Sequence, residues 1–208
     1  LIAEYGTLEN LLAHAGEIPA ARTRSLLREQ ADAARLSKRL AALQDDVALP
    51  LTLAGRKPGD IDFWVVRENV EDLYAGIEHM VGRDAAESIK IITRAASERI
   101  ARFAFQTALK KQRGAPEDGR KRVTLVDKSN VLRSFAFFRR IFLKVAEEFP
   151  EVTAECLYVD AAAAALVGRP QHFQVIVTEN MFGDILSDLG GATIGGLGMC
   201  PSANIGES

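Results

Sequence analysis

Apolar residues recur at helical spacing over the first 49 residues of the chain and in short, dense runs after residue 60. The leucines at 8, 11 and 12 share one helical face, and those at 26, 27, 40 and 43 repeat the pattern. Gly16 and Pro19 interrupt it. The pattern predicts a helical segment, residues 1–49, made of two helices with a break at 16–19.

A different pattern follows a junction at residues 50–60, where Pro50, Pro58 and Gly59 are breakers. Short runs of β-branched and aromatic residues then alternate with longer helical patterns over residues 61–208. This alternation predicts an α/β fold with a mixed or mostly parallel sheet, in which ligands bind where strands end and helices begin. The predicted strands are 61–66, 89–92, 123–126, 157–159 and 175–177, and the predicted helices are 95–112, 131–148, 160–168 and 181–192.

Composition and charge favour a soluble globular protein that binds neither membranes nor nucleic acids through bulk charge. The formal net charge is −2, with 48% hydrophobic residues. No apolar run approaches the roughly 20 residues of a membrane span, and the first residues lack the layout of a signal peptide. Cys156 and Cys200 lie far apart without metal-ligand spacing, which favours a reducing, cytoplasmic setting. The chain begins at Leu1 within a helical pattern, so we interpret it as a fragment.

Arg67 and Tyr74 form the first candidate cluster, directly after the strand at 61–66. An arginine at a strand end can bind a carboxylate through two parallel hydrogen bonds, and a tyrosine seven residues later can donate a proton. The alternative is structural: Arg67 pairs with a nearby acid and Tyr74 packs.

Lys128 follows the strand at 123–126, where a lysine with a lowered pKa can act as a base. Most lysines at such positions are simply solvated. Asp184 and Asp188 lie four residues apart on the last predicted helix, and their repulsion is relieved if a cation lies between them. Asp160, at the end of the strand 157–159, could add a third oxygen ligand. All-oxygen ligands favour Mg²⁺ or Mn²⁺, although a solvated acid pair is an equally good interpretation.

Several ordered motifs between Leu53 and Glu207 resemble the isocitrate/isopropylmalate dehydrogenase family, which also contains tartrate dehydrogenase. The motifs are Asp60–Asn69 (DIDFWVVREN), Asp127–Arg133 (DKSNVLR), Tyr158–Asp160 (YVD), Val175–Asp188 (VIVTENMFGDILSD) and Gly195–Gly206 (GGLGMCPSANIG). The resemblance implies an isopropylmalate-dehydrogenase-like domain, incomplete here and preceded by the helical segment.

The resemblance also implies a reaction, the oxidative decarboxylation of a 2-hydroxy acid with hydride transfer to NAD⁺ or NADP⁺. Arg67 would bind a substrate carboxylate, and Asn130 would lie near the nicotinamide. Mg²⁺ or Mn²⁺ would be bound by three carboxylates, those of Asp160, Asp184 and Asp188, and would acidify the hydroxyl and stabilise the enolate. Lys128 would help remove the hydroxyl proton, and Tyr74 would reprotonate the enol carbon. Lys128 and Asp160 would act in the partner subunit's site, which implies an obligate homodimer.

The substrate and the choice between NAD⁺ and NADP⁺ stay open. Arg67–Gly76 is more similar to isocitrate-type members, and Gly55–Asp60 to tartrate- and isopropylmalate-type members. The family's N-terminal strands and its adenosine-binding loop have no counterpart here, so we expect the fragment to be inactive alone. A metal-binding, dimerising domain without turnover is the main alternative.

Residues 1–49 resemble the helical end of the 5′-nuclease domain of bacterial DNA polymerase I, without that domain's metal-binding carboxylates. A fusion or an assembly artefact near 48–56 would explain the pairing. A DNA-interacting chimera ranks last among the hypotheses, because the helices carry as many acids as scattered bases.

Overall fold

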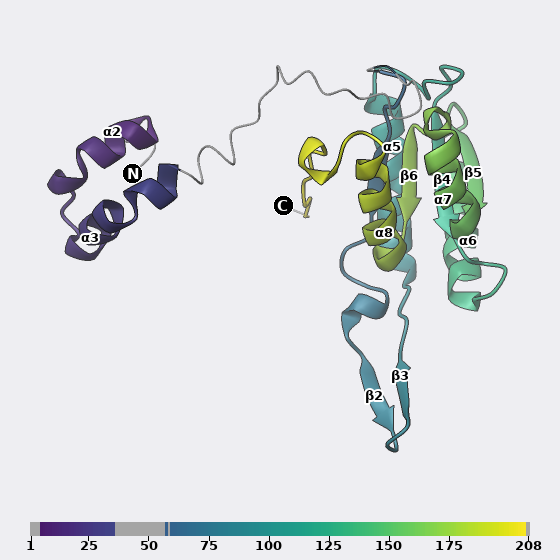
Figure 1. The fold of residues 1–208 in the computed structure, drawn as a ribbon. Helices are drawn as coiled ribbons and strands as arrows, with labels where there is room; N and C mark the ends of the chain where they lie inside the picture. The colour runs from purple at the N-terminus through teal and green to yellow at the C-terminus, as the bar shows by residue number, and fades with distance from the viewer. Residues whose placement is uncertain (1–4, 36–56, 58, 207–208) are drawn as a thin grey trace. The chain divides into compact units, whose positions relative to one another are not determined.

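The computed structural model describes residues 5–35, 57 and 59–206, and the chain divides into two compact units, Leu1–Pro50 and Leu51–Ser208 (Figure 1). Most of the predicted junction at 50–60 and residues 36–49 of the predicted helical segment lie outside the described residues. The first unit contains α2 (Leu8–Ala13), the 3-10 turn η1 (Ala15–Glu17) and α3 (Ala21–Glu29). Helix α2 begins where the Thr7 hydroxyl accepts a hydrogen bond from the backbone of Asn10. The helices are interrupted where the sequence predicted a break.

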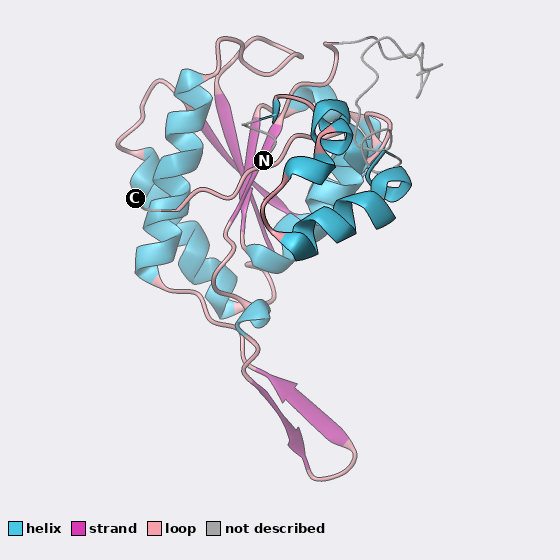
Figure 2. Cartoon of the chain, turned by 90° about the vertical axis from the view of Figure 1, so that its left-hand side faces the viewer, coloured by secondary structure: helices cyan, strands magenta, loops and turns pink. Residues whose placement is uncertain are grey.

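The second unit is built on a four-stranded parallel sheet with the order β1-β6-β4-β5. Helices cover both faces of the sheet, so the unit has three layers (Figure 2). The α/β prediction is confirmed, with an entirely parallel main sheet. Its strands are β1 (Trp64–Arg67), β4 (Arg122–Asp127), β5 (Thr153–Tyr158) and β6 (Val175–Thr178), and its helices are α5 (Arg94–Lys110), α6 (Arg133–Ala146), α7 (Val159–Gly168) and α8 (Asn180–Ala192).

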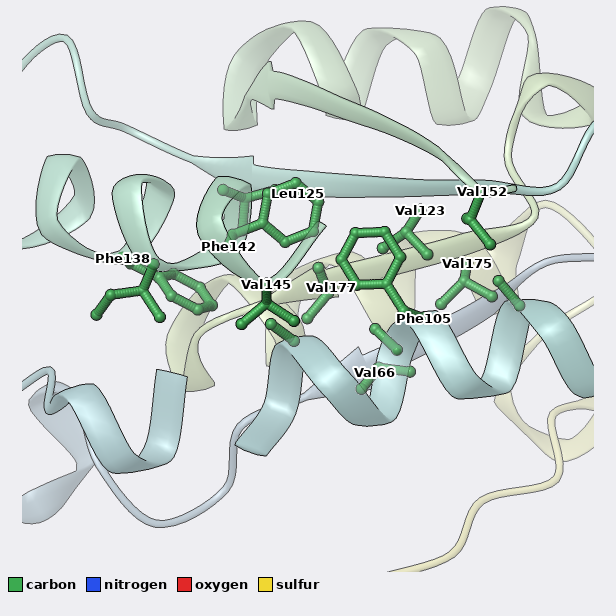
Figure 3. Close-up of a cluster of buried hydrophobic side chains, with 14 residues drawn as sticks. Val66, Phe105, Val123, Leu125, Phe138, Phe142, Val145, Val152, Val175 and Val177 are labelled. Atoms are coloured by element: carbon green, nitrogen blue, oxygen red, sulfur yellow. The ribbon is translucent and has the colours of Figure 1, made fainter. Parts of the chain in front are cut away.

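Alternating strand residues divide the core between the two faces of this sheet. Val66, Leu125 and Val177 contact α5 and α6 in one cluster (Figure 3), whereas Val126 and Ile176 face α7 and α8 in the other. Strands β4 and β6 are buried along their whole length, which explains their continuous apolar runs.

The predicted strand at Ile89–Ile92 is wrong. Ile91 forms only an isolated bridge with Asp72, while the residues just before this run form an antiparallel hairpin of β2 (Glu78–Val81) and β3 (Ala85–Ser88). The apolar run instead leads back into the body of the unit, where Ile92 packs against the core. Both hairpin strands are exposed throughout and project away from the sheet (Figures 1 and 2). An exposed hairpin has no buried face, so its sequence lacks the alternation that predicts a strand.

Among the described residues, no helix is long and apolar enough to cross a membrane.

A network of charged side chains joins the loop before β4 to the loop before β6. Arg169 donates two hydrogen bonds of 2.8 Å to the Glu117 carboxylate, and His172 lies 2.8 Å from both Glu117 and Glu155. The hydrogen bonds from Arg169 and then His172 lower the pKa of Glu117 from 4.5 to about 2. Loop 113–120 is therefore held to the loop before β6 by charged hydrogen bonds.

This lowered pKa predicts acid sensitivity. A carboxyl group whose pKa is depressed in the folded state stabilises that state fully above its unfolded pKa, and this contribution is lost as the pH falls through the folded value. We expect the free energy of unfolding to fall between pH 4.5 and about 2, and Glu117→Gln to flatten this dependence. Glu151→Gln, at an exposed glutamate, is the control. Equal pH slopes for all three proteins in urea unfolding would contradict the prediction.

Candidate functional site

Arg67, Tyr74 and Asp184 meet at the carboxyl edge of the sheet. Arg67 is the last residue of β1, Tyr74 lies in the 3-10 turn η2 (Leu73–Ala75), and Asp184 lies in α8. Arg67 Nη1 donates to Asp184 Oδ1 at 2.5 Å, and the Tyr74 hydroxyl donates to Asp184 Oδ2 at 2.9 Å. The Arg67 guanidinium also lies 5.7 Å from the centre of the Tyr74 ring. Two residues that the sequence grouped together thus converge on a third, 110 residues farther along the chain.

The start of α8 is shaped to receive Arg67. Glu179 caps the helix by accepting hydrogen bonds from the backbone of Met181 and Phe182, and Arg67 Nε donates to Asn180 Oδ1 at 2.9 Å. Gly183 leaves room for the arginine, because a Cβ at this position would lie 2.6 Å from Arg67 Cγ. The guanidinium is therefore held in one orientation at the end of β1.

Electrostatics keep Tyr74 protonated and Asp184 ionised. The hydrogen bond to Asp184 raises the pKa of Tyr74, and the hydrogen bonds from Tyr74 and Arg67 lower the pKa of Asp184. Both side chains are about half exposed, so a ligand can reach them. The cluster offers a cation for a carboxylate, a hydroxyl proton donor and a hard anionic oxygen ligand.

Lys128 and Asp160 form a second cluster at the same edge, beyond β4 and β5. They form an ion pair that lowers the pKa of Asp160, which lies in the first turn of α7 and is exposed. Asn130 is exposed in the turn after β4. Just before Lys128, the fully buried Asp127 accepts two hydrogen bonds from Arg139, at 2.7 and 2.8 Å. That pair fixes the backbone from which Lys128 extends.

The three carboxylates that the sequence suggested as metal ligands do not gather within one chain. Asp160 is paired with Lys128, Asp184 is paired with Arg67, and no group of three potential ligands forms among the described residues. Asp188 lies exposed one turn after Asp184 on α8. Two carboxylates one turn apart still suit Mg²⁺, which commonly takes one or two protein carboxylates and fills its other positions with water or substrate oxygens.

Sequence reasoning missed a buried charged cluster beside this site. Lys90 pairs with both Asp72 and Glu179, and its nitrogen lies 2.9 Å from the Glu179 carboxylate. Burial lowers the pKa of Lys90, against the opposing effect of Asp72. The signal was present in the sequence, since Lys90 interrupts the apolar run Ile89–Ile92, but its partners lie 18 and 89 residues away.

Comparison with known proteins identifies relatives of the chain. The family model described as isocitrate/isopropylmalate dehydrogenase matches residues 39–208. The chain is 50% identical over 160 residues to the NADP-type isocitrate dehydrogenase of Thermus thermophilus, covering 76% of this chain and 30% of the relative. It is 52% identical over 149 residues to the 3-isopropylmalate dehydrogenase of Methanothermobacter thermautotrophicus, covering 71% and 43%.

The fold also has counterparts among solved structures. The crystal structure of the TT0538 protein from Thermus thermophilus matches with a TM-score of 0.67 and 51% identity, over 76% of this chain and 30% of that one. The chain spans less than half the length of these relatives. With the fold and the sequence in agreement, the chain belongs to the isocitrate/isopropylmalate dehydrogenase family.

Proposed function

We propose that the α/β unit serves the metal-dependent oxidative decarboxylation of a 2-hydroxy acid such as isocitrate, 3-isopropylmalate or tartrate, with hydride transfer to NAD⁺ or NADP⁺. The observation that carries the proposal is the convergence of Arg67, Tyr74 and Asp184 at the carboxyl edge of a parallel sheet, where such folds bind ligands. The family of the chain supports the reaction class. The two cysteines of the chain, Cys156 and Cys200, form no disulfide, which is compatible with a cytoplasmic setting.

Each side chain has a task in this reaction. Mg²⁺ or Mn²⁺, bound by Asp184 and Asp188 with Asp160 as the third ligand, would supply Lewis acidity at the substrate's hydroxyl and adjacent carboxylate. Arg67 would bind the substrate carboxylate through its guanidinium, which Asn180 keeps in position by accepting a hydrogen bond from Nε.

Proton transfers fall to the remaining side chains. Lys128 would take part in removing the hydroxyl proton as hydride leaves, and Tyr74, which its raised pKa keeps protonated, would protonate the carbon left by CO₂. Asn130 would lie beside the nicotinamide. These roles require both clusters at the edge of the sheet.

We further propose a homodimer in which Lys128 and Asp160 complete the partner's site. Within one chain these two residues pair with each other and not with the cluster at Asp184. The β2–β3 hairpin also suits a partner, since an isolated two-stranded hairpin is marginally stable and its strand edges invite pairing. Its exposed apolar side chains include Met80 and Val81, at 62% and 46% exposure.

The proposal is tested by calorimetric titration of Mn²⁺ into the purified chain, with the oligomeric state measured by light scattering. We expect a dimer that binds Mn²⁺ specifically. Asp184→Asn removes a direct ligand, so we expect it to weaken binding by more than the roughly 10- to 100-fold typical of losing an outer-shell partner.

Asp32→Asn, at an exposed aspartate of the first unit, is the matched control and should leave Mn²⁺ binding unchanged. A folded wild-type chain that binds no Mn²⁺, or an Asp184→Asn variant that binds it equally well, would refute the metal site.

A metal-binding, dimerising domain without turnover is the second candidate, because the two carboxylates of Asp184 and Asp188, one turn apart on α8, suit a divalent ion without a nucleotide. It predicts specific Mn²⁺ binding but no protection from unfolding by NAD⁺ or NADP⁺. Thermal shifts with each nucleotide distinguish the two candidates.

A further inference from the structure

Lys90 is a buried charged residue, and removing a charge from water is costly. Its side chain is 12% exposed, and those of its partners Asp72 and Glu179 are 1% and 4% exposed. Its nitrogen also lies 4.4 Å from the centre of the Phe135 ring. Replacing such buried pairs with apolar residues is often neutral or stabilising, so stability alone is a weak explanation for the cluster.

Both carboxylates of the cluster hold the first turn of α8. Asp72 Oδ2 accepts a hydrogen bond from the Met181 backbone at 2.9 Å, and Glu179 accepts from the backbone of Met181 and Phe182 at 3.1 and 2.8 Å. Lys90 provides the positive charge that allows two acids to share this place. We call Asp72, Lys90 and Glu179 the clamp. Asp184 follows Met181 by three residues, so the clamp lies next to the proposed metal site.

The same clamp holds the turn that carries Tyr74. Asp72 has φ 80° and ψ −156°, a backbone conformation that is strained for a residue with a side chain and persists only where its surroundings enforce it. Lys90 and the Met181 backbone bind the two oxygens of the Asp72 carboxylate. The turn η2 begins at the next residue, so the conformation of Asp72 sets the direction of Tyr74.

Lys90 also links the Arg67–Tyr74–Asp184 cluster to the part of the sheet edge that carries Lys128. The Phe135 ring beneath its ammonium belongs to α6 and stacks on Phe182 of α8 at 5.0 Å. Helix α6 follows the loop that carries Lys128 and Asn130. Lys90 thus interacts with elements on both sides of the site. In the described residues it makes no direct contact with Arg67, Tyr74 or Asp184.

We propose that Lys90 is a positioning residue that fixes Tyr74 relative to the carboxylates of α8, acting through Asp72 and Glu179. The inference rests on the proposed function for its purpose, but the geometry it claims can be measured without metal or substrate.

The test labels the chain with 3-fluorotyrosine and records the ¹⁹F spectrum. There are three tyrosines, and Tyr74→Phe identifies one signal; the others belong to Tyr5 and Tyr158. We expect Lys90→Met to shift or broaden the Tyr74 signal while the other two keep theirs. Lys90→Arg retains the charge, so its Tyr74 signal should lie closer to the wild-type position. Lys110→Met, at an exposed lysine of α5, should leave all three signals unchanged.

Mn²⁺ titration of the same variants supplies the second measurement. We expect Lys90→Met to weaken Mn²⁺ binding about 10- to 100-fold, as loss of an outer-shell partner does, with Lys110→Met unchanged. A purely structural role would lower the unfolding temperature and leave both the Tyr74 signal and the Mn²⁺ affinity of the folded variant unchanged.

The Mn²⁺ titration and the ¹⁹F spectra test the proposed function and the role of Lys90 separately. If the wild-type chain binds no Mn²⁺, the metal site fails, while the Tyr74 signal still decides the role of Lys90. Should Lys90→Met fail to fold, Glu179→Gln replaces it, because it removes one charge at nearly constant size and should shift the Tyr74 signal in the same direction. An unchanged Tyr74 signal in the folded variants overturns the proposal.

Discussion

Arg139→Met is expected to destabilise the α/β unit by about 3–5 kcal/mol, because it leaves a buried carboxylate without its counter-charge. Asp127 is fully buried at the end of β4, and Arg139 of α6 donates to both of its oxygens. In the variant, the Ser129 backbone would be the remaining donor described for that carboxylate. Methionine replaces the aliphatic part of the arginine side chain, so the loss reports mainly on the charge and its hydrogen bonds.

Urea unfolding measures this effect through the fluorescence of Trp64, the single tryptophan, which lies in the α/β unit. Arg140→Met is the matched control on the same helix: Arg140 is exposed and stacks over Phe137, so its loss should cost less than about 1 kcal/mol. Adding Asp127→Asn to Arg139→Met should recover part of the stability. Equal midpoints for the two arginine variants would refute the argument.

The layered fold was predictable because its two central strands are fully buried. Strands β4 and β6 are covered by helices on both faces, so each reads as a continuous apolar run, and the helices between them show clear periodicity. The hairpin could not be found in this way. Its residues are exposed on both faces, and its tip at Gly82, with φ 68°, was the main local signal of a turn.

Sequence patterns pointed to individual candidate residues but not to all of the contacts between them. Strand ends pointed to Arg67 and Lys128, and helical spacing to Asp184, since those signals are local. Asp160 remains apart from Asp184 within one chain because it begins the helix after β5, at the other side of the sheet from β1. The pairing of Lys90 with Asp72 depends on a backbone conformation that no local pattern in the sequence reveals.

The largest purely apolar effect is expected for Phe105→Ala, at about 3–5 kcal/mol, because it opens a cavity at the centre of the core between α5 and α6. Phe105 is fully buried and stacks on Phe142 and Phe149, with ring centres 5.2 and 5.1 Å away (Figure 3 shows its position against the sheet). Leu143→Ala, at an exposed leucine of α6, should cost less than about 1 kcal/mol.

Phe105→Ala also distinguishes an effect on the stability of the fold from an effect on the metal site. The Phe105 cluster lies on the opposite face of the sheet from α8, which carries Asp184. At temperatures where Phe105→Ala remains folded, we therefore expect its Mn²⁺ affinity to equal that of the wild-type chain even though its unfolding midpoint in urea falls. A matched loss of Mn²⁺ affinity in the folded variant would mean that the packing of α5 and α6 helps to set the geometry of the edge, and that the two faces of the sheet do not act independently.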